Sequence, residues 1–346
     1  MTEKAEMVGR SRAPVFVVGC PRSGTTLLYH MLLSAGDFAV YRAESQAFNL
    51  LAPRFGDLSV RKNRQRLMNK WLQTGMFAVS GLDSNQIAAK ILNECKDYGD
   101  FLRIVMEEIA VKQNVHRWAD CTPEHLLYMR EIKETLPGAL IIHIIRDGRD
   151  VALSMGQQGW IRPFWWDMKG SLMAAALYWR WLVRKGRGYG QIVAPSYMEV
   201  RYEELVADPP RVLAKIGDFI DHDLDYDRIL RVGIGSVSQP NTSFGSNGGF
   251  NPVGRWKKLL SRRDLGALEG LIGDLLADLG CPLTAPSGEV SENRLNVRLT
   301  RALYDFRFDA KHWAKNRVRL NEIWSRDIPA WAGASTEKRR MQNAER

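Results

Sequence analysis

The feature that most constrains this chain is a short loop, Gly19-Cys20-Pro21-Arg22-Ser23-Gly24-Thr25-Thr26, set between an apolar run and a helical pattern. Residues 14–19, PVFVVG, are typical of a strand buried on both faces. Residues 24–35 place four large apolar side chains on one side of a helix. Glycines and small residues let the N–H groups of such a loop converge on an anion, and the helix N-terminus adds its dipole. The sequence therefore predicts a strand, a phosphate-binding loop and a helix.

Two further segments repeat this order of strand and helix. The run ALIIHII at 139–145 ends in Arg146-Asp147-Gly148, and a helix is expected to begin near Asp150. The run YMEVRY at 197–202 is followed by an acidic turn with two prolines and then by the apolar-periodic segment VLAKIGDFI. The stretch 40–118 reads mostly helical. Strands that alternate with helices predict an α/β class with a parallel sheet and right-handed crossovers.

Composition narrows the class of protein but not its partner. With 45% hydrophobic and 25% charged residues in 346, the chain has material for a large core, which excludes disorder as its main state. A net charge of +10 suits an anionic partner of any kind. No motif of a nucleic-acid reader is present, so no nucleic-acid partner is predicted. The fifteen C-terminal residues, polar and charged, are expected to be disordered.

Cysteine spacing and hydropathy give an expectation of location. The four cysteines lie far apart and form no CxxC pair, which argues against a zinc site or a disulfide framework and for a reducing compartment. The first fourteen residues have no apolar core of a signal peptide, and the longest apolar runs are too short to span a bilayer. We expect a cytoplasmic protein without a transmembrane segment, and peripheral membrane contact stays open.

The loop resembles that of a known family. Thr25 stands where the Walker A motif of nucleotide triphosphatases needs lysine, and the cation of the loop is Arg22. The order PRSGTTLL closely resembles the 5′-phosphosulfate loop of sulfotransferases that use 3′-phosphoadenosine 5′-phosphosulfate (PAPS). The resemblance implies a three-layer P-loop fold, a central parallel sheet flanked by helices with helical insertions. It implies PAPS as co-substrate and adenosine 3′,5′-bisphosphate as product. The loop residues that it assigns to nucleotide binding are Arg22, Ser23, Gly24, Thr25, Thr26 and Leu27.

Later segments resemble the rest of that nucleotide site. Arg146 and Ser154, in IIHIIRDGRDVALS, match the family's arginine and serine for the 3′-phosphate, where a guanidinium offers a bidentate fork. Tyr202, in EVRYEEL, matches a tyrosine near the adenine. In NPVGRWK, the resemblance gives Arg255 to the 3′-phosphate and Trp256 to the base. Asp150 receives no catalytic role, and Arg149 is expected to be a structural ion-pair residue.

The resemblance spans residues 14–280 and sets the expected domain organisation. Residues 1–13 are expected to be a flexible N-terminus and 14–284 the sulfotransferase domain. A C-terminal helical extension is expected at 285–331, followed by a disordered tail at 332–346. We find no internal repeat and no clear linker between domains.

For the chemistry, the resemblance gives three candidate catalytic residues. Arg22 is assigned to the charge that develops on the departing phosphate oxygen. Glu44 matches the position of the catalytic glutamate in the tyrosylprotein-sulfotransferase branch, which makes it the first candidate for the general base. His125, in Asp120-Cys121-Thr122-Pro123-Glu124-His125, is the rival, since this segment resembles the family's KTP.H motif. No metal is expected.

Cys121 is where the sequence departs from the family, because many relatives have lysine there. The absence of this lysine puts the second cationic stabiliser of the transferring group in doubt, and Arg42 and Lys90 are the candidates to replace the lysine. The aromatic stretch 160–181 suits either an acceptor pocket or ordinary core packing.

The sequence predicts sulfuryl transfer from PAPS to a hydroxyl of a small-molecule, glycolipid or carbohydrate acceptor. One alternative is a degenerate member of the family that holds a nucleotide without transfer. The other is a P-loop kinase, with Asp147 as magnesium ligand, although Thr25 and Arg146 argue against it. The acceptor's identity and the oligomeric state stay open.

Overall fold

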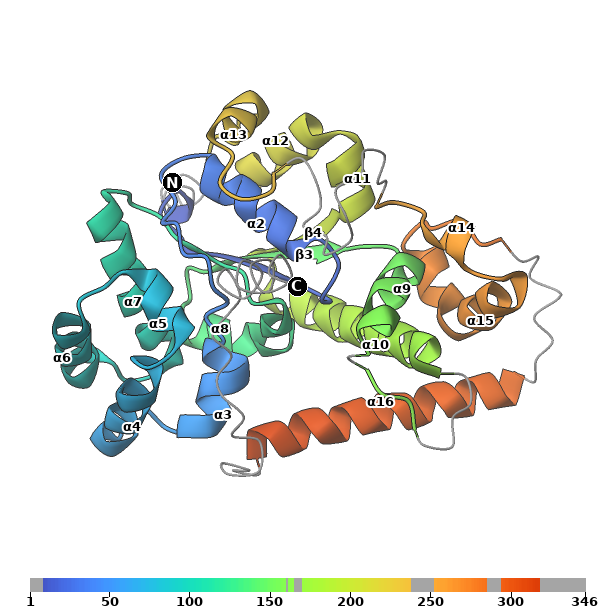
Figure 1. The fold of residues 1–346 in the computed structure, drawn as a ribbon, viewed down its shortest axis with the longest axis horizontal. Coiled ribbons are helices and arrows are strands. Elements are labelled where there is room, and N and C mark those ends of the chain that lie inside the picture. Colours follow the sequence, from blue (N-terminus) through green and yellow to red (C-terminus); the bar gives the residue numbers. More distant parts are fainter. Residues whose placement is uncertain (1–8, 160, 165–169, 238–251, 285–293, 318–346) are drawn as a thin grey trace, which may run out of the picture.

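A parallel four-stranded sheet with the order β2-β1-β3-β4 forms the centre of the molecule (Figure 1). The structure, a computed structural model, describes residues 9–159, 161–164, 170–237, 252–284 and 294–317. The predictions for residues 1–8, for 285–293 and for 318–346 therefore lie outside the described residues. The strands are β1 (Val15–Gly19), β2 (Ala119–Asp120), β3 (Leu140–Ile145) and β4 (Tyr197–Arg201).

Each central strand is apolar on both faces because both faces are covered. All residues of β1 and β3 are buried, as expected for parallel strands between two helical layers. Phe16 and Ile141 contribute to one hydrophobic core, whereas Val17 and Ile142 contribute to the other. This alternation follows from the two-residue period of a strand.

Helices cover both faces of the sheet, so the molecule has three layers, helix, sheet and helix, which confirms the predicted α/β class. On one face lie α2 (Thr25–Ser34), α11 (Tyr202–Ala207), α12 (Pro209–Ile220) and α13 (Tyr226–Val232). The other core includes α7 (Tyr98–Gln113), α8 (Met129–Thr135), α9 (Gly148–Gln158) and α10 (Gly170–Val193).

The insertion between α2 and β2 is helical, as the sequence predicts. It contains a π-helical turn, η1 (Ala47–Leu51), followed by α3 (Ala52–Phe55), α4 (Arg61–Trp71), α5 (Gly75–Ser80) and α6 (Ser84–Glu94) before α7. A 3-10 helix, η2 (Pro123–Tyr128), follows β2 and packs against η1. This contact brings two segments about 75 residues apart in the chain to one place, next to the end of β1.

The C-terminal part adds α14 (Trp256–Leu259), α15 (Arg262–Asp278) and α16 (Arg294–Arg317), the last of which runs along the lower edge of the molecule in Figure 1. The helix α16 lies within the predicted helical extension at 285–331. None of the helices in the described ranges combines the length and the apolar character needed to cross a bilayer.

Candidate active site

The loop between β1 and α2 has a backbone that depends on glycine at one position. Gly24 has φ 98°, and a β-carbon there would lie 2.3 Å from a ring carbon of Tyr202. Only glycine therefore permits both this backbone and this packing. Arg22 also has a positive φ, 74°, which is unusual for a residue with a side chain and costs free energy.

The predicted residues of the nucleotide site meet at the carboxyl edge of the sheet. Arg22 Nε donates to Ser154 Oγ at 2.9 Å, and Arg146 Nη1 donates to the carbonyl oxygen of Arg22 at 3.0 Å. The guanidinium of Arg146 lies over the ring of Tyr202, 4.6 Å from its centroid. Strands β1, β3 and β4 each end at this edge, which is where ligands of open α/β sheets bind.

Positive charge is concentrated around the loop. Burial lowers the pKa of Arg22, and the neighbouring charges of Arg146 and Arg255 lower it further. Three guanidiniums that repel one another are stabilised together by an anion, so this part of the site suits a multiply charged ligand. Of the remaining loop residues, Thr25 and Leu27 are buried in the first turn of α2, whereas Thr26 is half-buried.

Three buried polar atoms at this edge test whether a nucleotide fits. Within the described residues, Ser23 Oγ, Arg146 Nε and Tyr202 Oη have no hydrogen-bond partner. A buried polar atom without a partner costs free energy, and a ligand rich in oxygen atoms removes that cost. The residues present therefore fit the phosphorylated nucleotide that the sequence predicts.

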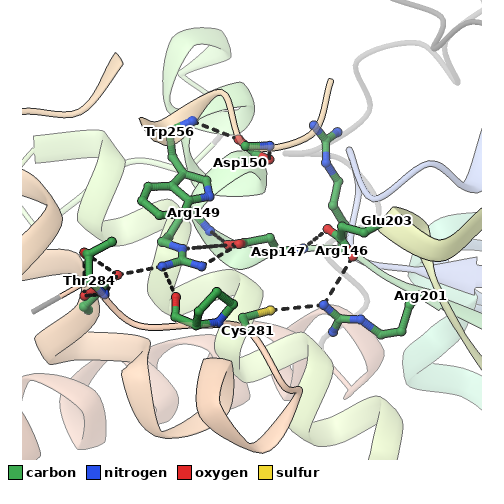
Figure 2. Close-up of polar contacts among 12 residues, drawn as sticks. Arg146, Asp147, Arg149, Asp150, Arg201, Glu203, Trp256, Cys281 and Thr284 are labelled. Carbon is green, nitrogen blue, oxygen red and sulfur yellow. Dashed lines mark hydrogen bonds and ion pairs between the residues drawn. The ribbon is translucent and has the colours of Figure 1, made fainter. Parts of the chain in front are cut away.

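Asp150, at the start of α9, binds a segment of the chain that follows it by about 100 residues and lies at the site. Its carboxylate accepts hydrogen bonds from Gly254 N–H at 2.7 Å and from Trp256 N–H at 3.1 Å (Figure 2). Arg146 Nη2 donates to the carbonyl oxygen of Pro252 in the same segment. From the sequence Asp150 receives no catalytic role, and nothing in the local pattern indicates hydrogen-bond partners 104 and 106 residues away.

The guanidinium of Arg149 is the centre of a buried ion cluster beside this segment. It bonds Asp147 at 2.7 Å and Glu269 of α15 at 2.6 Å (Figure 2). The expected structural role of Arg149 agrees with this geometry. Because Arg149 binds the carboxylate of Asp147, that group has a cation partner already, which argues against its use as the magnesium ligand of a kinase.

Trp256 packs on Arg149 as well. The guanidinium carbon of Arg149 lies 3.7 Å from the centroid of the buried Trp256 ring. One face of Trp256 is therefore covered by protein, and its predicted packing on the adenine stays a prediction. Arg255 lies near enough to lower the pKa of Arg22, so the structure brings it to the same cationic region.

Glu44, the first candidate for the general base, is half-buried beside two other carboxylates. Burial raises its pKa to about 7, and the charges of Asp120 and Glu124 add to the shift. Gln46 Nε2 donates a hydrogen bond to Glu44 Oε2, and the Gln46 backbone has a positive φ of 54°. A carboxylate with a pKa near neutrality is suited to accept a proton at physiological pH.

His125, the rival candidate, has both ring nitrogens engaged inside the protein. Its Nδ1 is 2.9 Å from Asp120 Oδ2, to which it donates, and its Nε2 accepts from Phe48 N–H at 3.3 Å. The ring is fully buried and packs against Phe16 and Phe48. The geometry therefore suits a positioning role for His125, which holds η1 against η2, and the choice of base stays a prediction.

Cys121 is a buried thiol between the loop and Glu44. Burial raises its pKa well above the usual value, the charge of Glu44 raises it further, and a hydrogen bond with Thr25 opposes the shift. Of the two candidates to replace the missing lysine, Lys90 is ion-paired with Glu108 at 2.5 Å and Arg42 is exposed. The position of Cys121 thus carries no positive charge.

The aromatic stretch 160–181 is in part core. Trp179 and Trp181 are buried in α10, and Trp179 Nε1 donates to the carbonyl oxygen of Arg146 at 3.1 Å. Trp160, Trp165 and Trp166 lie outside the described residues, so the acceptor-pocket interpretation stays a prediction for them.

Comparison with known proteins gives a family and a fold. The model of the family described as the sulfotransferase family matches residues 14–226. The sulfotransferase domain of the Synechococcus PCC 7002 olefin synthase has a TM-score of 0.54 at 20% identity, over 78% of this chain and 96% of that one. The sulfotransferase domain from the curacin biosynthetic pathway has a TM-score of 0.56 at 17% identity, over 79% and 99%. No curated protein matches the sequence.

Proposed function

The chain belongs to the sulfotransferase family and is a sulfotransferase, and from that premise we propose that it transfers a sulfuryl group from PAPS to a hydroxyl of a small-molecule, glycolipid or carbohydrate acceptor. The observation that carries the choice of donor is the meeting of Arg22, Arg146 and Ser154 at the carboxyl edge of the sheet. Buried polar atoms of Ser23 and Tyr202 without a partner among the described residues support it.

In this proposal the nucleotide site has two phosphate-binding parts. The loop amides, Arg22 and the N-terminus of α2 bind the 5′-phosphosulfate. Arg146 and Ser154 bind the 3′-phosphate, with Arg146 exchanging a backbone carbonyl partner for phosphate oxygens. Tyr202 packs near the adenine, and Asp150 holds the segment 252–256 closed over the nucleotide.

The transfer itself is a displacement at sulfur. The acceptor oxygen forms a bond to sulfur while the bond between sulfur and the bridging phosphate oxygen breaks, and the hydroxyl proton moves to Glu44. Negative charge grows on the bridging oxygen, where Arg22 and the loop amides stabilise it. Adenosine 3′,5′-bisphosphate and the sulfate ester are the products. The choice of Glu44 rests on its pKa near 7 and on the similarity to the tyrosylprotein branch.

Calorimetry of nucleotide binding tests the donor without any knowledge of the acceptor. Adenosine 3′,5′-bisphosphate is expected to bind roughly 10- to 100-fold more tightly than adenosine 5′-phosphate, because Arg146 and Ser154 contact the additional phosphate. Arg146→Ala is expected to remove most of that preference, whereas Arg211→Ala, on the exposed surface of α12, should keep it. Equal affinities of the unaltered protein for both nucleotides would contradict PAPS as the donor.

The alternative without transfer is favoured by one observation, the uncharged buried thiol at Cys121. Mass spectrometry of a panel of hydroxyl-bearing acceptors incubated with labelled PAPS separates the two functions. Transfer that Glu44→Gln nearly abolishes and His125→Asn leaves measurable supports our proposal. Tight binding of the bisphosphate with no labelled product from any acceptor supports the nucleotide-holding alternative. Phosphoryl transfer from a nucleoside triphosphate that requires magnesium and stops with chelator would favour the kinase alternative instead.

A further inference from the structure

The outer face of α16 is an exposed apolar stripe. Its large apolar residues recur at intervals of four, four, three and seven, which places them on one side of a helix. Large apolar side chains are rarely exposed to solvent together on one face of a single helix. The stripe is formed by Leu295, Leu299, Leu303, Phe306 and Trp313, which are 61%, 59%, 43%, 73% and 60% exposed.

The opposite side of α16 is fixed to the body of the protein, so the stripe has a defined orientation. Tyr304 and Phe308 are buried, and Arg301 bonds Asp274 of α15 at 3.1 Å. Figure 1 shows α16 along the lower edge, with the body of the molecule on one side only. The helix therefore presents its apolar stripe to solvent without any need to turn over.

Among the described residues of α16, the charged side chains beside the stripe that have no ion-pair partner are basic. Arg298 and Arg317 are exposed; at 100° per residue Arg298 lies on one flank of the stripe, about 60° from Leu295, and Arg317 lies in line with the stripe at its C-terminal end. Neither has an ion-pair partner within the described ranges. The acidic residues of the same helix, Asp305 and Asp309, are paired with Arg180 and Lys185 of α10.

These observations distinguish between a second copy of the chain and a lipid surface. A helix of 24 residues is about 36 Å long, and a stripe about 10 Å wide offers on the order of 360 Å². A stable protein interface buries about 800 Å² on each partner. Two copies meeting on this stripe would also bring these basic residues together, which is unfavourable.

We propose that α16 docks the protein on an anionic lipid surface, lying in the plane of the interface. Phe306 and Trp313 enter the boundary between headgroups and acyl chains, and Arg298 and Arg317 contact anionic headgroups beside them. An aromatic and leucine-rich face with basic residues beside it is the composition of an interfacial helix. This docking is independent of sulfuryl transfer.

Cosedimentation of the full chain with vesicles tests the apolar part of the proposal. Binding is expected on phosphatidylcholine vesicles that contain about a third phosphatidylglycerol, a composition chosen for its negative surface potential. Phe306→Ser with Trp313→Ser is expected to lower the partition coefficient roughly tenfold or more, since two large apolar side chains no longer leave water. The matched control, Val111→Ser with Ile192→Ser, removes two apolar residues of other helices that are 74% and 63% exposed and should not change binding.

A second pair of variants tests the charge. Arg298→Gln with Arg317→Gln is expected to weaken binding to the anionic vesicles roughly 10- to 30-fold, and added salt should produce the same loss in the unaltered chain. The control is Lys215→Gln with Arg231→Gln, which removes two exposed charges from α12 and α13 at the opposite edge of the molecule (Figure 1). It should leave binding nearly unchanged.

Four results would overturn the proposal. Absence of binding to anionic vesicles removes it, and binding that the Phe306 and Trp313 variants leave intact places the contact elsewhere. A dimer in sedimentation velocity that those variants dissociate assigns the stripe to a second copy. A marked fall in melting temperature in those variants alone, compared with the Val111 and Ile192 pair, assigns the stripe to another part of the same chain. None of these results depends on transfer activity.

Discussion

Glu44 lies below the surface and next to two other carboxylates, and both conditions disfavour its charged form. Its pKa of about 7 therefore has a local cause, burial first and the charges of Asp120 and Glu124 second. The same environment that makes it a suitable base makes its ionisation costly to the folded state. This linkage gives a test of Glu44 that needs no acceptor.

Glu44→Gln is expected to stabilise the protein at alkaline pH. An acid whose pKa is raised by folding, here from 4.5 to about 7, contributes stability that is present below pH 4.5 and is lost as pH rises through 7. Glutamine has no such loss. The melting temperature of the variant minus that of the parent should therefore grow by roughly 2–4 °C between pH 5 and pH 8. Glu94→Gln, an exposed control in α6, should show no such trend; a flat difference for Glu44→Gln would show that its pKa is ordinary.

A neighbour of Glu44 offers a prediction in the opposite direction. Glu124→Gln removes one of the negative charges that raise the pKa of Glu44, while keeping the shape of the side chain. The acidic limb of the pH profile of kcat/KM should move to lower pH, by roughly half a unit to one unit. Glu131→Gln, a change in α8 whose carboxyl has its own raised pKa, should leave the limb in place. A limb that stays fixed in Glu124→Gln would mean that another group accepts the proton.

Candidate residues of the nucleotide site could be predicted where a local sequence motif indicates phosphate binding. Arg22 and Arg146 follow the ends of strands, Tyr202 begins α11 and Ser154 lies within α9. The structure brings the four residues to one edge of the sheet, and their binding of a nucleotide stays a prediction. Asp150 could not be predicted in the same way, because its function depends on backbone N–H groups more than 100 residues later.

The choice between Glu44 and His125 also needed tertiary contacts. From the sequence, both residues matched family positions. Only the folded chain shows that Asp120 and Phe48 N–H engage the two nitrogens of His125. The sequence motif around a histidine is the same whether its ring faces a substrate or the hydrophobic core.

At the scale of elements, the loop between β1 and α2 is held by a contact as well as by its own backbone. Gly24 packs directly under the ring of Tyr202, so a substitution there meets two obstacles, strain at positive φ and a clash. Gly36 has a similar φ of 93° but nothing within 4 Å of the position of a β-carbon. The two glycines therefore separate the two effects.

Gly24→Ala is expected to weaken binding of adenosine 3′,5′-bisphosphate at least tenfold, because Tyr202 and the loop must both move. Gly36→Ala should cost stability of about 1 kcal/mol through backbone strain and leave the affinity unchanged. Calorimetric titration of both variants, with their melting temperatures, checks the pair. Equal affinities for the two variants would show that the contact between Gly24 and Tyr202 does not shape the site.

Elements with a strong local pattern were predicted and one without such a pattern was not. Strands β1 and β3 are buried, mainly apolar runs of five and six residues, and the helical insertion at 40–118 has its expected character. Strand β2 has only Ala119 and Asp120, too short for any periodicity, and it exists because it pairs with Val15 and Phe16 of β1. Its place in the sheet is a product of tertiary structure.

At the scale of the whole molecule, the C-terminal helices complete a site that the N-terminal half begins. Glu269 of α15 binds Arg149, and Lys315 in the last turn of α16 binds Glu124 at 3.1 Å. Neither contact could be predicted from the sequence: Lys315 lies beyond residue 280, where the resemblance to the family ends, and no local pattern indicates that Glu269 pairs with a residue 120 positions earlier. The charge of Lys315 lowers the pKa of Glu124, and Glu124 in turn acts on Glu44.

The attachment of α16 to the body can be tested with two aromatic residues on its two sides. Tyr304 is 1% exposed and packs with Phe164 and Phe308, whereas Phe306 is 73% exposed. Tyr304→Ala should lower the free energy of unfolding by about 3 kcal/mol, because it leaves a cavity under the helix, and Phe306→Ala should change it by less than about 0.5 kcal/mol. Urea unfolding followed by circular dichroism measures both.

Tyr304→Ala has a second expected consequence, because the helix that it loosens also carries Lys315. If α16 detaches before the body unfolds, the urea curve should show two transitions, with hydrogen exchange rising first in α16. The contact between Lys315 and Glu124 would then be lost, and the pKa of Glu124, which the charge of Lys315 lowers, should rise. A single cooperative transition would instead make α16 an integral part of one folding unit. Equal destabilisation by Tyr304→Ala and Phe306→Ala would contradict the orientation of the helix itself.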